Sequence, residues 1–278
     1  MSHSPLGLIA GNLNLPLVVA QKIRDQGSPL VVVGLKGETD PKVATLADAY
    51  LELPLGQLQP LADFFLQNGA QKVCLIGGVS RDNVISAYQP DAVALELMAT
   101  LDNFHTDAIL RAVGGWLEAI GLSLVAVTDL VPDLAIKPGQ LTKTSPSPSL
   151  LADLSLAYQV AKELGRLDVG QTVVVSDKIV VALEGADGTD ETIRRGASLC
   201  RKPVAVAKVV KPTQDPRLDP PVVGPATFET LIAARAGALA LDAQGLIFLE
   251  RDLCLAQADD HNLAVVAWLN APQPKCGS

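Results

Sequence analysis

Features that mark membrane, secreted and zinc-binding proteins are scarce in this chain. Its 278 residues are only 4% aromatic and include four cysteines, none of which forms a CxxC pair. That spacing is typical of reduced thiols in a cytosol and argues against a disulfide framework or a zinc site. The longest apolar runs, such as residues 30–33 and 204–207, are far shorter than the roughly 20 residues that span a bilayer.

Basic clusters and targeting signals are also missing. The chain carries 30 acidic and 22 basic side chains, a net charge of −8. We expect no nucleic-acid partner, because neutralising phosphates requires clustered Lys and Arg. Residues 1–5 lack the charged and apolar regions of a signal peptide. An apolar share of 49% excludes pervasive disorder. We therefore expect a cytoplasmic globular protein of one large or two modest domains.

The first 130 residues alternate short apolar runs with amphipathic segments. Residues 6–10 predict a buried strand, and the helix that follows presents Leu15, Val19 and Ile23 on one face. Further strands are predicted at 29–34, 72–78 and 122–127, with a helix over 110–120. This alternation predicts an α/β fold whose N-terminal domain is a Rossmann-like parallel sheet with flanking helices.

The second half predicts a mixed α/β domain. Residues 172–175 and 178–183 flank a turn and are typical of a β-hairpin. Thr189 is predicted to cap a helix that has Asp190 and Glu191 in its first turn. The other elements predicted here are helices from 151 and over 228–236, and strands at 204–210, 246–249 and 263–268.

One stretch separates these two patterns. Residues 134–149 are rich in Pro, Ser and Thr and predict an interdomain connection. We therefore predict an N-terminal Rossmann-like domain over 1–133, a linker over 134–149 and a C-terminal catalytic domain over 150–278.

Two loops of the first domain are candidates for ligand binding. Gly11 and Asn12 follow the first strand, while Gly78 and Arg81 follow the strand at 72–78. Ligands of such sheets bind at the carboxyl ends of the strands. The alternatives are a plain strand-to-helix turn and a solvated arginine. The GxGxxG fingerprint is missing, which disfavours a nicotinamide-dependent oxidoreductase.

The second domain has denser polar segments. Residues 184–190 follow a strand and open a helix, which places carboxylates, glycines and backbone N–H groups together. Carboxylate oxygens suit Mg²⁺ or Mn²⁺, and a helix N-terminus suits an anion. An ordinary capped turn explains the pattern equally well. Residues 208–221 combine lysines, an arginine and aspartates with four prolines. Phosphoryl chemistry uses this mixture, although a solvated loop is the alternative.

The order of these motifs resembles that of the LpxI-type UDP-2,3-diacylglucosamine pyrophosphatases, over about residues 6–268. The segments that carry the resemblance are Gly7–Gly11 with Leu15-Pro16, Leu35–Gly37, Thr106–Arg111, Leu167–Gln171, Gly188–Asp190, Lys211-Pro212 with Gln214, and Arg217–Asp219. The chain departs from the family pattern at Asn12 and Leu13, where relatives have more glycine, and at Ser80, where relatives have lysine.

The resemblance implies a two-domain cytoplasmic enzyme of lipid A biosynthesis, in peripheral contact with the cytoplasmic face of the inner membrane. Its partner would be a UDP-linked glycolipid, hydrolysed to 2,3-diacylglucosamine 1-phosphate (lipid X) and UMP. It would use a divalent metal such as Mg²⁺, with Mn²⁺ as the alternative, and the essential aspartate of the family matches Asp219. We also predict a homodimer, because two-fold symmetry is common.

Chemistry assigns roles to the remaining candidates. The predicted catalytic residues are Asp219, Asp215 and Arg217, and the predicted metal ligands are Asp187, Asp190 and Asp219. The predicted substrate-binding residues are Gly11, Asn12, Gly78, Arg81, Gly188, Thr189, Lys208, Lys211 and Gln214. A different class stays open at this point, a non-catalytic binding or regulatory protein for a UDP-linked ligand.

Overall fold

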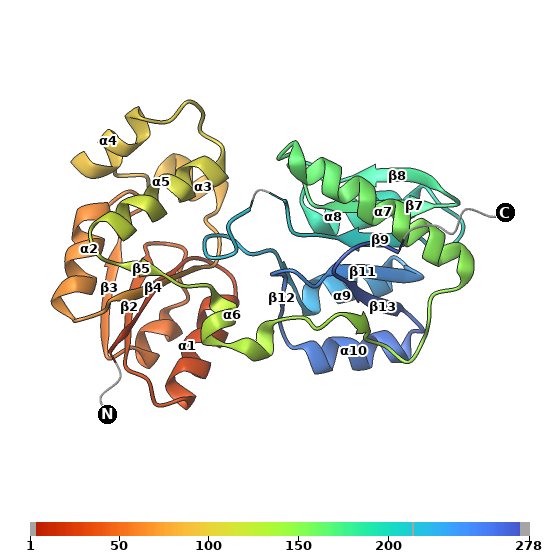
Figure 1. Cartoon of the computed structure of the whole chain (residues 1–278), viewed down its shortest axis with the longest axis horizontal. Coiled ribbons are helices and arrows are strands. Elements are labelled where there is room, and N and C mark those ends of the chain that lie inside the picture. The colour runs from red at the N-terminus through yellow and green to blue at the C-terminus, as the bar shows by residue number, and fades with distance from the viewer. Residues whose placement is uncertain (1–3, 213, 273–278) are drawn as a thin grey trace. The chain divides into compact units, whose positions relative to one another are not determined.

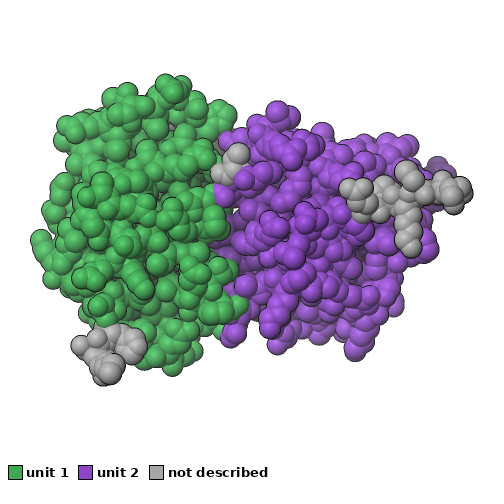
Figure 2. All heavy atoms as spheres, in the orientation of Figure 1, with its two compact units in different colours: residues 1–132, 215–219 green, residues 133–214, 220–278 purple. Residues whose placement is uncertain are grey.

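The computed structural model describes residues 4–212 and 214–272, apart from the side chains of residues 81, 82 and 85. It divides into two compact units, which Figures 1 and 2 show. Unit 1 comprises residues 1–132 and 215–219, and unit 2 comprises residues 133–214 and 220–278. The chain therefore passes between the units three times. The predicted linker lies within unit 2, where part of it forms an edge strand.

Unit 1 is built on a parallel five-stranded sheet in the order β3-β2-β1-β4-β5. Its strands are β1 (Leu6–Ala10), β2 (Leu30–Leu35), β3 (Ala49–Leu53), β4 (Lys72–Ile76) and β5 (Ser123–Leu124). The central strands read as continuous apolar runs because helices cover both faces of a parallel sheet. The predicted Rossmann-like sheet is confirmed.

Helices cover this sheet. They are α1 (Leu15–Asp25), the 3₁₀ helix η1 (Pro41–Leu46), α2 (Leu58–Gln67), α3 (Arg81–Ser86), α4 (Ala92–Ala99), α5 (Thr106–Ala119) and α6 (Val127–Leu130). On one face, Phe65 of α2 and Leu117 of α5 pack with Ile9, Val33 and Leu75. Residues 122–127 do not form the long strand predicted for them, because only Ser123 and Leu124 pair with β4 before α6 begins.

Unit 2 holds a mixed six-stranded sheet in the order β6-β13-β11-β9-β7-β8. The strands of unit 2 are β6 (Gly139–Gln140), β7 (Thr172–Ser176), β8 (Ile179–Leu183), β9 (Ala205–Lys208), β10 (Val222–Val223), β11 (Ala238–Asp242), β12 (Ile247–Phe248) and β13 (Ala264–Trp268). The predicted hairpin is confirmed as the antiparallel pair β7–β8, while β9, β11 and β13 are parallel. Strands β10 and β12 form a separate parallel pair.

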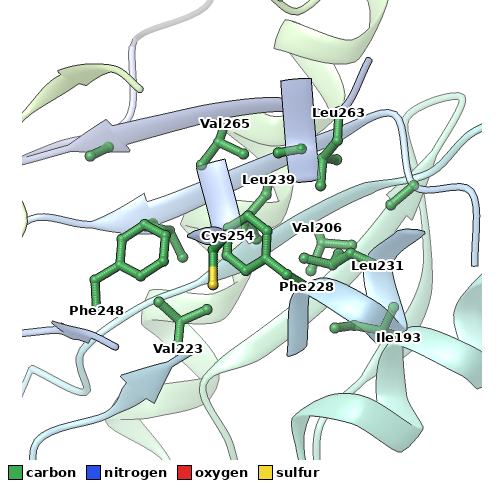
Figure 3. Close-up of a cluster of buried hydrophobic side chains, with 14 of the residues drawn as sticks. Ile193, Val206, Val223, Phe228, Leu231, Leu239, Phe248, Cys254, Leu263 and Val265 are labelled. Atoms are coloured by element: carbon green, nitrogen blue, oxygen red, sulfur yellow. The ribbon is translucent and has the colours of Figure 1, made fainter. Parts of the chain in front are cut away.

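The two faces of this sheet are covered differently. The helices are α7 (Pro148–Arg166), α8 (Thr189–Ser198), α9 (Pro225–Ala233) and α10 (Arg251–Asp260), and η2 (Pro132–Leu134) precedes them. Large side chains such as Phe228, Leu231 and Leu239 fill the layer beneath α8, α9 and α10 (Figure 3). On the other face, small residues such as Ala205 and Ala240 lie against α7. Their size lets that helix approach the sheet closely.

Candidate active site

A pocket of about 380 Å³ opens at the N-terminus of α8 in unit 2. Its size falls within the range of small-molecule sites, roughly 300–1,000 Å³. Five predicted site residues lie in its wall, namely Asp187, Gly188, Thr189, Asp190 and Lys208. The sequence pattern did not single out Arg194, which also lines the pocket. The sequence feature that indicates Arg194 is its position four residues after Asp190, which places both on the same helix face.

The start of α8 differs from the prediction by one residue, with a chemical consequence. Gly188, at φ +80°, is the N-cap, and Thr189 is the first helical residue. The Thr189 hydroxyl donates instead to Oε1 of buried Glu184 at 2.9 Å, and Oε2 of Glu184 accepts from the Gln171 N–H at 2.9 Å. Since α8 has no side-chain cap, its first N–H groups and its dipole favour an anion at the pocket.

Lys208 supplies a buried cation to the pocket wall. It ends β9, and the residue is only 6% exposed. Its Nζ donates to the Val222 carbonyl oxygen at 2.6 Å, which anchors strand β10. The Arg194 guanidinium is more exposed and contacts Glu191 and the Thr230 hydroxyl, each at 3.3 Å. The pocket thus combines two cations with a helix N-terminus.

The two predicted metal ligands of this pocket have different surroundings. An Arg195 guanidinium nitrogen lies 2.7 Å from Oδ2 of Asp187, and the Gly185 N–H donates to Oδ1 at 2.9 Å. These bonds, the arginine first, lower the pKa of Asp187 to about 2. Oδ1 of Asp190, by contrast, is buried and has no hydrogen-bond partner among the described residues.

A divalent cation fits this donor set in part. Oδ1 of Asp190 is a hard oxygen donor of the type that Mg²⁺ prefers. Within the described residues, no group of three or more His, Cys, Asp or Glu side chains is placed to hold a metal ion. The third predicted ligand, Asp219, belongs to the segment 215–219 of unit 1. The metal set therefore stays a prediction.

The loop that follows β9 begins with contacts to the end of α7. Nζ of Lys211 lies 2.6 Å from Oδ1 of Asp168 in an ion pair, and the Gln214 N–H donates to the Lys211 carbonyl oxygen at 3.1 Å. Lys211 and Gln214, both predicted to bind substrate, thus belong to one turn. The lysine charge is partly neutralised by Asp168.

The next residues form a closed ion-pair cluster within unit 1. Arg217 contacts both carboxylate oxygens of Asp215, at 2.7 Å from Nη2, and its Nη1 lies 2.7 Å from Oε1 of Glu118 on α5. The hydrogen bonds from Arg217 are the main reason that the pKa of Asp215 is lowered. Leu218 is buried in the unit 1 core, whereas Asp219 is exposed.

The structure also brings the two predicted loops of unit 1 together. The Asn12 N–H donates to the Gly78 carbonyl oxygen at 2.8 Å, and the Gly78 N–H donates to Oδ1 of Asn12 at 3.1 Å. A Cβ on Gly11 would lie 2.3 Å from the Gly78 carbonyl oxygen, so only glycine permits this approach. The Arg81 side chain lies outside the described residues.

Sequence reasoning missed the residue that joins these loops, Glu38. Its Oε2 accepts from the Asn12 amide at 2.7 Å, and its Oε1 accepts from the Ser80 N–H and hydroxyl at 2.9 and 2.6 Å. Burial alone raises the pKa of Glu38, but these hydrogen bonds outweigh it and the pKa is lowered. The available signal was an acidic residue shortly after the second strand of a Rossmann-like sheet.

Across the part of the chain that the structure describes, every helix is too short or too polar to cross a bilayer.

Two family profiles together match almost the whole chain. The LpxI N-terminal domain matches residues 5–134, and the LpxI C-terminal domain matches residues 137–266. A curated relative, UDP-2,3-diacylglucosamine pyrophosphatase LpxI of Caulobacter vibrioides, is 34% identical over 274 residues. That alignment covers 94% of this chain and 96% of the relative.

Likeness to solved structures is slight. The biotin carboxylase subunit of a pyruvate carboxylase aligns with a TM-score of 0.28 and 14% identity, over 67% of this chain and 36% of that one. An N5-carboxyaminoimidazole synthetase from Staphylococcus aureus aligns with a TM-score of 0.24 and 14% identity, over 73% of this chain and 46% of that one. The chain thus spans less than half the length of either structure.

Proposed function

Because the chain belongs to the LpxI family, we propose that it hydrolyses the pyrophosphate of UDP-2,3-diacylglucosamine. Water adds to one phosphorus, the bridging P–O bond breaks, and the products are UMP and 2,3-diacylglucosamine 1-phosphate. The observation that carries the proposal is the pocket at α8, where buried Lys208 and the helix N-terminus meet carboxylates. Phosphoryl transfer proceeds chiefly through such positioning and charge stabilisation.

Each group of the pocket has a chemical task in this proposal. Lys208 and Arg194 neutralise charge on the phosphate oxygens, and the N–H groups that open α8 orient one of them. Asp187 is held by Arg195 and fixes the turn before the helix. Asp190, through its buried oxygen, binds a divalent cation. Such an ion, when bound, adds positive charge to the pyrophosphate oxygens.

Asp219 is the proposed catalytic residue of the chain. Its neighbour Arg217 forms ion pairs with both Asp215 and Glu118. The exposed Asp219 carboxylate can accept a proton from the attacking water or bind the metal. The arrangement assigns Asp215 and Arg217 chiefly to holding the segment that carries Asp219.

The remaining parts of the proposal concern the surroundings of the enzyme. We propose peripheral contact with the inner membrane on its cytoplasmic face, because the diacyl chains of the substrate are anchored there. Contact must be apolar, since a net charge of −8 is repelled by anionic lipid. The homodimer stays a prediction.

The test is release of UMP from UDP-2,3-diacylglucosamine in Mg²⁺, in Mn²⁺ and in EDTA. We expect metal-dependent release by the wild type and a loss of at least about 10³-fold in Asp219→Ala, as for removal of a catalytic group. Asp252→Ala, an exposed carboxylate outside the pocket, serves as the matched control. Turnover in H₂¹⁸O then identifies the attacked phosphorus from the product that carries the label.

An undiminished rate in Asp219→Ala contradicts its catalytic role. A folded wild type that binds UMP but releases none from the glycolipid, with any metal, supports the alternative of a binding or regulatory protein.

A further inference from the structure

One ion pair holds the backbone of Val210, at the start of the loop after β9. Two residues beyond the strand, the Val210 N–H donates to Oδ2 of Asp242 at 3.2 Å. The Val210 carbonyl oxygen accepts from Nζ of Lys162 on α7 at 2.9 Å. Lys162 and Asp242 also form an ion pair with each other. One charged pair therefore fixes both backbone polar groups of Val210.

The pair is largely buried, with the Lys162 side chain 23% exposed and the Asp242 side chain 0% exposed. Asp242 ends β11, and its Oδ1 accepts from the Gln244 N–H at 2.9 Å. Nζ of Lys162 also lies 5.7 Å from the centre of the Tyr158 ring. Removing two charges from water offsets much of their mutual attraction, and apolar residues of similar size often give an equally stable fold. Stability alone is thus a poor reason for this pair, whereas one fixed conformation of the loop is a physical consequence of it.

Two further contacts hold the same stretch of loop against α7. A Cβ on Gly165, one turn after Lys162, would lie 3.2 Å from Cα of Lys211 and from Cδ of Pro212. The missing side chain lets the loop lie directly on the helix. At the other end of the loop, the Val222 carbonyl oxygen accepts a hydrogen bond from Nζ of Lys208. Each end is therefore fixed by a lysine amine on a backbone carbonyl.

We infer that Lys162 and Asp242 are positioning residues for the reaction proposed above, on which this inference rests. Their ion pair fixes the backbone two residues beyond Lys208, the buried cation of the pocket at α8, and neither side chain lines that pocket. A displacement of about 1 Å in a reacting group lowers turnover by about 100-fold. The pair thus acts on the rate of the chemical step rather than on the affinity for substrate.

The test replaces both charges by apolar side chains, in the double variant Lys162→Met/Asp242→Leu. We expect a folded protein whose kcat falls about 10- to 100-fold, whereas KM changes less than about 3-fold, because every charged side chain of the pocket is still present. Hydrogen exchange of the Val210 amide accelerates, since its acceptor is gone. The control is Lys202→Met/Asp177→Asn, at an exposed ion pair of the same unit (side chains 70% and 60% exposed), which retains wild-type kcat and the wild-type exchange rate at Val210; asparagine is chosen because residue 177 has φ +50°.

A second variant keeps the inference testable if the double variant fails to fold. Gly165→Ala leaves the ion pair in place but pushes Lys211 and Pro212 away from α7. We expect a several-fold lower kcat, with a smaller change in KM. A wild-type kcat in either folded variant overturns the inference. Full activity of Asp219→Ala in the wild-type background overturns the proposed function instead, so the two failures are distinguishable.

Discussion

The two units differ in the side chains that they place at the carboxyl ends of their parallel strands. In unit 1 the loops after β1, β2 and β4 are bonded to one another through the Glu38 carboxylate. In unit 2 the end of β9 presents a buried amine, Lys208, to an open pocket. The unit 1 loops enclose a carboxylate to which no cation of the described residues is bonded, whereas the unit 2 pocket sets Lys208, Arg194 and a helix N-terminus beside its carboxylates, and those cationic groups can bind a phosphate. The comparison teaches that strand order alone does not decide the charge at the end of a strand, and it predicts that the phosphates of the substrate bind at unit 2.

After Asp219→Ala, the largest effect on activity is expected from removing the cation of unit 2. Lys208→Met keeps the apolar stem but deletes the charge and the bond to the Val222 carbonyl oxygen. We expect kcat/KM for UMP release to fall about 10²- to 10³-fold, as for loss of one preorganised donor. Lys143→Met, at a lysine whose side chain is 91% exposed, is the control. Equal kcat/KM values in the two variants would contradict the assignment of phosphate binding to this pocket.

The next largest effect is expected from weakening the hydrogen bonds that Glu38 accepts in unit 1. Glu38→Gln loses a charged acceptor of three hydrogen bonds, so we expect the free energy of unfolding to decrease by about 1–2 kcal/mol. Urea denaturation measures it, with Glu52→Gln, an exposed site on β3, as the control. We expect kcat/KM to change less than that of Lys208→Met. A larger loss of activity than in Lys208→Met would reverse the comparison between the units.

A smaller effect is visible only in acid. The pKa of Asp187 is about 2 in the folded protein, mainly because of Arg195, against about 3.9 in an unfolded chain. The stabilisation is complete above about pH 4 and is lost as the pH falls towards 2. Asp187→Asn should therefore show a shallower decrease of Tm between pH 4 and pH 2 than the wild type, measured by circular dichroism. Parallel curves for the two proteins would show that Arg195 does not lower this pKa.

The smallest effect concerns the cores, where the units are alike. Burial raises the pKa of the Cys74 thiol in unit 1 to about 12 and that of Cys254 in unit 2 to about 11. Both thiols therefore stay protonated and covered at pH 8. We expect neither to be alkylated by iodoacetamide in the folded protein, as peptide mass spectrometry would show. Rapid alkylation of one of them would mean that its unit opens more readily than the other.

Local sequence patterns predicted those parts of the fold that local physics determines. Buried strands such as β1 and β2 are apolar runs, and the hairpin β7–β8 is two such runs around a turn. Strand β6 is only two residues long and depends on pairing with distant β13, so no pattern in its own sequence marks it.

The candidate site was predictable to a similar extent. The segment around Asp187–Asp190 was found because it follows a strand and opens a helix, a local feature. The bonds of Glu38 to Asn12 and Ser80 join residues 26 and 42 positions apart, and no spacing rule connects them. Thr189 was misassigned as a cap because its competing acceptor, Glu184, is visible only in three dimensions.

Because residues 215–219 belong to unit 1, the chain cannot be divided into two fragments near residue 132 without separating parts of one core. Leu218 comes from the second half of the sequence but fills the unit 1 core, where a Cβ on Gly114 would meet it at 3.0 Å. Residues 1–132 expressed alone would carry a hole at this position, and the complementary fragment would expose an apolar side chain. We therefore expect neither fragment, 1–132 or 133–278, to fold as stably alone as it does within the whole chain.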